Sequence, residues 1–164
     1  MRLTHLSLTE AEAETLAAVL DRLIPSDDRG PGAVEAGVLA FIDSELAGAL
    51  KHQHGAYAAG LAELDAQAVA QHGEPFARLP APAQDELLRG MEAASGPWFE
   101  MVLGDCIDGL LSDPAYGGNR DFAGWRLVGY PGPSLIWTEE EQELDRRIPF
   151  RGSSLSRFLV ARRG

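Results

Sequence analysis

Apolar residues recur every three or four positions through the first two thirds of the chain, as they do along one face of an amphipathic helix. A capping box at Thr9 and Glu12 opens the first predicted helix, and Pro25 ends it. The five apolar stripes are Leu16, Val19, Leu20 and Leu23; Val38, Ile42, Leu46 and Leu50; Tyr57, Leu61, Leu64 and Ala68; Leu87, Leu88 and Met91; and Phe99, Val102, Leu103, Cys106, Ile107, Leu110 and Leu111.

Glycine and proline separate these stripes. The third predicted helix ends near Gly73, and the prolines that follow it indicate no regular structure until Pro82 starts the fourth helix. The fifth helix, from Gly96 to Asp113, has the widest apolar face, so we expect it at the centre of the fold. No segment alternates between apolar and polar residues as a half-buried strand does. The pattern predicts an all-α, single-domain bundle of about five main helices.

Residues 112–134 interrupt the helical period with glycine, proline and aromatic side chains. We call this segment the glycine-aromatic loop. Ordering its five glycines costs backbone entropy, which burial of Trp125 and other aromatic rings can offset. Gly117-Gly118-Asn119 is predicted to take positive φ angles, and Asn119 and Asp121 to cap a short helix that starts at Phe122.

The same loop is the leading candidate for a protein interface, because Trp, Tyr and Arg dominate interface energetics. A folding role and an interface role are compatible, and we expect part of Tyr116, Arg120, Trp125 or Tyr130 to stay exposed. The predicted partner-binding residues are Tyr116, Asn119, Arg120, Asp121, Trp125, Arg126 and Tyr130.

A C-terminal extension, residues 135–164, follows a domain predicted to span residues 1–134. A second capping box at Thr138 and Glu141 predicts a short acidic helix, which Pro149 ends. Beyond it the extension is basic, so it serves either as a solvated tail or as a docking segment for an acidic surface of this chain or of a partner. Six of the 14 basic residues lie in the last 19 positions: Arg146, Arg147, Arg151, Arg157, Arg162 and Arg163.

Composition narrows the classes of partner. The chain has 164 residues, enough for one domain with a real core, and a formal net charge of −11. Such a charge repels phosphate backbones and anionic lipids, so we expect neither nucleic-acid binding nor direct membrane insertion. The single cysteine, Cys106, excludes an intrachain disulfide.

Residue types that form catalytic and metal sites occur here without their usual partners. His52 and His54 point about 200° apart on a helix, and no further ligand stands at metal-ligand spacing. Cys106 lies on an apolar face, where we expect a buried thiol with a raised pKa. Asp105 and Asp108 are one turn apart and are predicted to face solvent.

Nucleotide and hydrolase motifs are also missing from the sequence. The Gly30-Pro31-Gly32 segment lacks the third glycine of a phosphate loop, follows a helix rather than a strand, and has Asp27 and Asp28 beside it. No nucleophile elbow, Walker motif or H-E-x-x-H is present. We therefore predict no catalytic, cofactor-binding or metal-binding residue in this chain.

Two blocks carry a resemblance to a known family. They are I-P-S-D-D-R-G-P-G-A-V-E-A-G-V, from Ile24 to Val38, and D-P-A-Y-G-G-N-R-D-F-A-G-W-R-L-V-G-Y-P-G, from Asp113 to Gly132. Together they resemble the gluconate 2-dehydrogenase subunit 3 family, with similarity running from about Leu8 to Pro133.

The resemblance implies a cofactor-free small subunit of a heteromeric dehydrogenase. In that family the large subunit resembles the glucose-methanol-choline oxidoreductases and carries FAD, often with an iron-sulfur cluster, and a cytochrome c subunit can take the electrons. Members act on sugars, sugar acids, polyols or glycosides. The small subunit is thought to support folding, assembly and export of the large one.

Two alternatives remain at this point. One is a self-sufficient helical enzyme or small-molecule binder with a site under residues 113–132, using Arg120, Asp121 and Tyr116. The other is a transient chaperone that is absent from the mature complex. Many members of the family carry a twin-arginine leader, and this sequence as written has none, so we expect a cytoplasmic location. A periplasmic one would follow from a removed leader or from export with a partner.

Overall fold

The computed structural model describes residues 5–94, 96–134 and 136–155, and within these ranges the chain is all-α, as predicted. The α-helices are α1 (Glu10–Leu23), α2 (Val38–Ala47), α3 (His54–His72), α4 (Ala81–Ala93), α5 (Pro97–Leu111) and α6 (Ala123–Val128). Single 3-10 turns are η1 (Lys51–Gln53), η2 (Phe76–Arg78), η3 (Pro114–Tyr116), η4 (Arg120–Phe122) and η5 (Glu140–Gln142).

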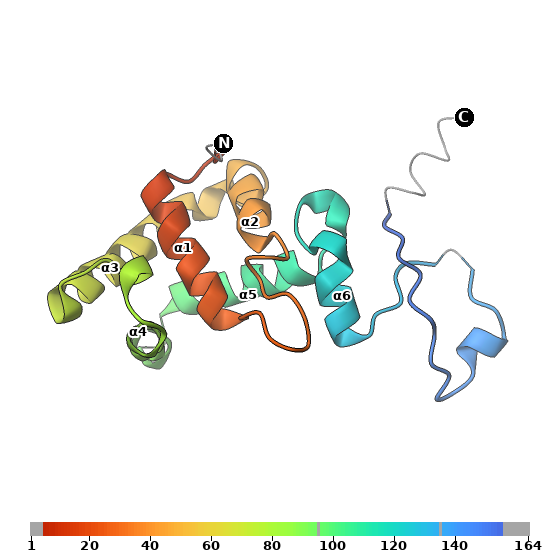
Figure 1. Cartoon of the computed structure of the whole chain (residues 1–164). Coiled ribbons are helices and arrows are strands. Elements are labelled where there is room, and N and C mark those ends of the chain that lie inside the picture. Colours follow the sequence, from red (N-terminus) through yellow and green to blue (C-terminus); the bar gives the residue numbers. More distant parts are fainter. Residues whose placement is uncertain (1–4, 95, 135, 156–164) are drawn as a thin grey trace.

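Helix α5 is the centre of the bundle, as its wide apolar face predicts. It contacts α1, α2, α3, α4 and α6, and Figure 1 shows it running beneath α1 and α2 toward α6. Val102 and Cys106 of α5 are fully buried against the apolar stripes of the surrounding helices. The start of α1 is also as predicted: Thr9 and Glu12 form a complete capping box.

Two carboxylates, the buried Asp43 and the half-buried Asp65, tie bundle segments together in ways that helical periodicity does not reveal. Asp43 of α2 accepts hydrogen bonds from the backbone N–H groups of Leu6, Ser7 and Leu8 at 2.6–2.9 Å, which fastens the N-terminal segment to the bundle. Burial raises the pKa of the Asp43 carboxyl, but these three bonds outweigh that effect and the pKa lies below its ordinary value of 3.8. Asp65 of α3 links α1 to η2 through Thr15 and the N–H of Phe76.

Three local predictions for the bundle were wrong. Leu50 lies beyond the end of α2, because the helix stops at Ala47. The proline-rich stretch before α4 contains the 3-10 turn η2, whose Phe76 is fully buried; one tight turn satisfies the proline constraints and the apolar ring together. Asp105 does not simply face solvent, since its carboxylate accepts a 2.7 Å hydrogen bond from the buried Tyr57 hydroxyl.

An arm of irregular chain, residues 136–155, follows the glycine-aromatic loop. Figure 1 shows it leaving the end of α6 and running away from the bundle, with the turn η5 near its far end. The predicted acidic helix is only this 3-10 turn, although Thr138 and Glu141 do form the expected reciprocal bonds. The arginines at positions 157, 162 and 163, named above as part of the basic extension, lie outside the described residues.

Candidate partner-binding surface

Asn119 holds the glycine-aromatic loop together from the inside. Its side chain is fully buried, donates to the carbonyl of Ser112 at 2.8 Å, and accepts from the N–H groups of Gly124 at 2.9 Å and Trp125 at 3.4 Å. It thereby caps α6, as expected. Asp121 has no such role, because its side chain is exposed and makes no hydrogen bond that we identify.

The helix after this cap begins one residue later than predicted. Phe122 has φ of 61° and therefore stands outside α6, which starts at Ala123. Of the predicted positive-φ positions, Gly117 and Asn119 are in the left-handed region, whereas Gly118 is not. A side chain at Gly118 would overlap the carbonyl oxygen of Gly109 in α5, so this glycine permits close approach of the loop rather than a turn.

Gly124 has the same function in α6. A Cβ atom there would overlap the carbonyl oxygen of Leu110, so α6 rests directly on the backbone at the end of α5. On the opposite side, the N–H of Arg120 donates to the carbonyl of Ala36 at 2.8 Å. The glycine-aromatic loop is thus fixed both to α5 and to the segment before α2.

Trp125 provides most of the apolar burial in the loop. Only 5% of its surface is exposed, and its Nε1–H donates to the carbonyl of Leu111 at 2.7 Å. Its ring makes an edge contact with Tyr130 at 5.0 Å and a tilted contact with Phe122 at 5.4 Å, and Phe122 in turn meets Phe150 of the arm at 5.5 Å. The predicted folding of Trp125 onto the bundle is confirmed.

Asp113 joins the loop to the arm. One carboxylate oxygen accepts from the N–H of Ala115 at 2.9 Å, and the other accepts from the N–H of Leu155 at 2.6 Å. The N–H of Arg151 adds a bond to the carbonyl of Pro131 at 2.7 Å. The bonds from Arg151 and Leu155 hold the C-terminal end of the arm beside the loop.

The surface around these anchors is apolar and exposed. In the part of the chain that the structure describes, thirteen large apolar side chains are exposed, and ten of them fall in residues 107–155. The ten are Ile107, Leu111, Tyr116, Leu127, Val128, Tyr130, Ile136, Trp137, Leu144 and Leu155. Since large exposed apolar patches are uncommon on monomers, this concentration makes the region the candidate interaction surface.

Two adjoining recesses give that surface its shape. One, of about 580 Å³, is lined by Leu111, Asp113, Tyr116, Trp125, Val128, Tyr130, Pro133 and Leu155. The other, of about 400 Å³, shares Leu111 and Tyr116 and extends to Phe41 of α2. We call the surface formed by Leu111, Tyr116, Val128, Tyr130 and Leu155 the loop face.

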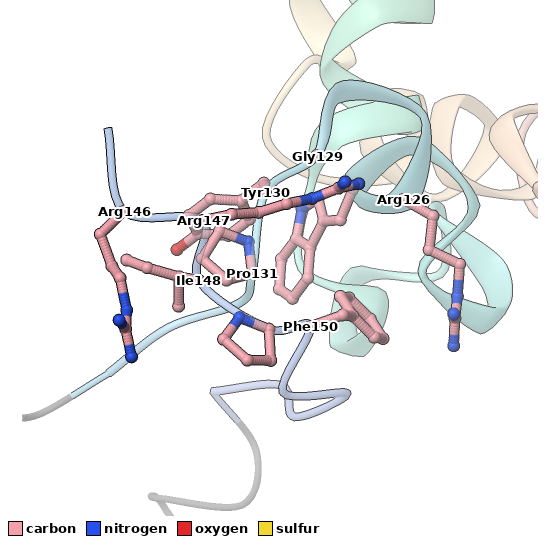
Figure 2. Close-up of a pocket in the computed structure, with 10 residues that line it drawn as sticks. Arg126, Gly129, Tyr130, Pro131, Arg146, Arg147, Ile148 and Phe150 are labelled. Atoms are coloured by element: carbon pink, nitrogen blue, oxygen red, sulfur yellow. The ribbon is translucent and has the colours of Figure 1, made fainter. Parts of the chain in front are cut away.

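A third cavity, of about 640 Å³, lies between the loop and the arm and has arginines around it. Figure 2 shows Arg126 and Arg146 on opposite sides of this cavity. Arg126 lies over the Phe150 ring at 4.2 Å, and Arg146 is paired with Glu140. Both guanidinium groups thus already contact groups of the same chain, and they do not converge on a shared site for an anionic ligand.

The predicted partner-binding residues divide by exposure. Tyr116, Arg120, Asp121, Arg126 and Tyr130 are exposed, whereas Asn119 and Trp125 are buried and position the others. Their role in binding a partner stays a prediction. Sequence reasoning missed Leu111, Val128 and Leu155. A signal for Val128 was available, because Gly129 directly follows it and ends a helix too short to bury both Leu127 and Val128.

The ionisable groups buried in the bundle have structural roles. Burial raises the pKa of the Cys106 thiol to about 12, and it raises the pKa of the Asp105 carboxyl above its ordinary value despite the bond from Tyr57.

Among the described residues no group of three or more His, Cys, Asp or Glu side chains could hold a metal ion. Over the same residues no helix has the length and apolar character needed to cross a bilayer.

The chain matches a protein-family profile. Residues 10–132 match the profile described as gluconate 2-dehydrogenase subunit 3. The matched span contains the whole bundle and nearly all of the glycine-aromatic loop, and it ends before the arm. No curated protein and no solved structure matches the chain.

Proposed function

Because the chain belongs to the gluconate 2-dehydrogenase subunit 3 family, we propose that it is a non-catalytic subunit that binds, stabilises and helps to assemble an FAD-dependent dehydrogenase. The large subunit is of the glucose-methanol-choline type and oxidises a sugar, sugar acid or glycoside. FAD, in some complexes with an iron-sulfur cluster, resides in that subunit, and a cytochrome c subunit is a further candidate partner. The family name supports a dehydrogenase subunit, and the flavoprotein partner is our inference.

The observation that carries this proposal is the unequal distribution of exposed apolar side chains. The loop face presents Tyr116, Val128 and Tyr130 to solvent over recesses that a partner side chain would fill. Burial of such side chains at a well-packed interface provides binding free energy, at about 25 cal/mol for each Å² of apolar surface removed from water.

Binding of this kind would stabilise the large subunit by mass action. A ligand that binds only the folded state adds about 2.7 kcal/mol of stability when its concentration is 100 times its Kd. Since the loop face is fixed beforehand by Asn119, Asp113 and Trp125, little further ordering opposes association. The same interaction would favour assembly of the flavin-loaded complex.

The test uses co-expression of the tagged full chain with the candidate flavoprotein subunit, followed by size exclusion monitored at a flavin wavelength. Val128→Ser is the test variant, and Val69→Ser on α3 is its matched control. Both valines lie in helices and have similar exposed fractions, 59% and 51%. We expect flavin to co-elute with the wild type and the control, and to be reduced about tenfold with Val128→Ser.

Other outcomes separate the alternatives. Equal flavin recovery for both variants would remove the loop face from the interface. Flavin absorbance or turnover in the purified chain alone would favour the self-sufficient enzyme. A chain that raises the yield of active flavoprotein but is absent from the mature complex would be a transient chaperone.

A further inference from the structure

The arm fixes its own shape without a partner. Glu141 accepts a 2.6 Å hydrogen bond from Arg151, the Arg151 guanidinium lies 4.6 Å from the centre of the Trp137 ring, and Arg146 is paired with Glu140. The reciprocal bonds between Thr138 and Glu141 close the turn at its far end. A segment ordered in this way loses less conformational entropy on binding than a free tail does.

The arm nevertheless leaves large apolar side chains in water. Leu144 is 95% exposed and Ile136 is 78% exposed, the two highest values among the large apolar residues described. Leu144 stands directly between Glu143 and Asp145 in the chain. These two carboxylates and Glu139 are exposed and have no ion-pair partner among the residues that the structure describes.

The arm is continuous with the loop face. Leu155, at the end of the described arm, lines the same recess as Tyr130 and Val128 of the loop, and Asp113 bonds to the backbone of Leu155. A partner that covers the loop face therefore also meets the base of the arm, and Figure 1 shows the arm extending outward from there. The family match ends at residue 132, so the arm lies outside the region shared with the family.

We propose that the arm is a second docking element, which inserts Leu144 and Ile136 into an apolar recess of the flavoprotein subunit bordered by Lys and Arg side chains. This inference rests on the proposed function. Leu144 and Ile136 supply the apolar contact, and Glu139, Glu143 and Asp145 supply charges that need basic partners. Since complementary charge selects among partners and suppresses wrong ones, the arm directs the chain to its own large subunit.

A second copy of this chain is the less favoured occupant. The chain has a net charge of −11, so a second copy would present a mostly acidic surface to Glu139, Glu143 and Asp145 and would be repelled. The arginines beside the third cavity, Arg126 and Arg146, already face groups of their own chain. A flavoprotein subunit with a basic recess would not be repelled and would supply the basic partners that a second copy lacks.

The experiment measures the Kd of full-length variants for the purified flavoprotein subunit. Leu144→Ser tests the apolar contact, with Leu6→Ser at another exposed leucine as its control. A triple charge reversal to Lys at Glu139, Glu143 and Asp145 tests the basic rim, and the same reversal at Glu14, Glu86 and Glu92 is its control. We expect about tenfold weaker binding for Leu144→Ser, a larger loss for the arm reversal that shrinks as salt is raised, and control values within about twofold of the wild type.

Three results would overturn the inference. If both arm variants bind as the wild type does while Val128→Ser binds weakly, the arm is no docking element and the proposed function stands. If the wild type itself fails to bind the flavoprotein, the proposed function fails together with the inference. If the wild type dimerises and Leu144→Ser abolishes the dimer without changing flavoprotein binding, the occupant is a second copy of the chain.

Discussion

Residues 5–106 differ from residues 107–155 in how completely their aromatic rings are buried. We call residues 107–155, which comprise the end of α5, the loop and the arm, the loop-and-arm region. In residues 5–106 the aromatic rings of Phe, Tyr and Trp are all buried, and those of Tyr57 and Phe76 are fully buried. In residues 107–155 one ring, Trp125, is buried, while Tyr116, Tyr130 and Trp137 remain partly in water. Only three large apolar side chains in residues 5–106 of the described structure are exposed, namely Leu6, Val34 and Val69.

This difference shows that a loop can be ordered from within while many of its apolar side chains remain exposed to solvent. Asn119, Asp113 and Trp125 order the backbone of the loop through hydrogen bonds and one buried ring. Ordering therefore does not require that every apolar side chain be covered by the chain itself. The bundle completes its own burial, and the loop-and-arm region leaves surface for a partner.

Among the substitutions that we propose, removal of the buried Trp125 ring should cause the largest loss of folding stability. Trp125→Ala deletes the apolar centre of the loop and its bond to Leu111, so we expect about 3–5 kcal/mol of destabilisation, with the bundle keeping its helical circular dichroism. Trp137→Ala removes a half-exposed ring of the arm and should cost less than about 1 kcal/mol. Urea unfolding measures both values; equal losses would mean that the two rings are equally structural.

Replacing Asn119 should have an intermediate effect. Asn119→Ala removes the cap of α6 and a buried hydrogen bond at a left-handed position, which we expect to cost about 2 kcal/mol. Asn119→Gly keeps the backbone conformation while losing the same bonds, so it should be less destabilised than Asn119→Ala. The reverse order in thermal unfolding would contradict the roles given to the backbone and to the side chain.

Apolar periodicity predicts the helices of the bundle but not the side-chain hydrogen bonds that order the loop. The helices of the bundle follow from apolar spacing because a helix buries one face. The stripes headed by Leu16 and Tyr57 were located correctly, and the stripe headed by Val38 was correct up to Leu46. Asp43 and Asp113 bond to residues that are distant in sequence, and Asn119 bonds from a left-handed backbone position. Composition and apolar spacing do not specify such pairings. For the candidate surface, the sequence located the loop and the exposure of Tyr116, Arg120 and Tyr130, but it did not predict that Leu111, Val128 and Leu155 would join them.

A smaller effect than those of Trp125→Ala and Asn119→Ala is expected at Asp43, inside the bundle. Its folded pKa is depressed, so the stability that its bonds provide is fully present above pH 3.8 and is lost as the pH falls through the folded value. Asp43→Asn should lower stability by about 1–2 kcal/mol near neutral pH, and the difference from wild type should shrink below pH 3.8. Thermal unfolding across pH measures this difference. Since the change lies away from the loop face, a loss of flavoprotein binding by Asp43→Asn would break the proposed separation of the two regions.

The central claim is that the loop-and-arm region, and not the rest of the bundle, meets the partner. Hydrogen–deuterium exchange of the chain alone and in complex with its flavoprotein subunit tests this most directly. The account predicts slower exchange on binding in peptides from residues 123–134 and 136–155, with α3 and α4 unchanged. Protection confined to α3 and α4, with α6 and the arm exchanging as in the free chain, would contradict it.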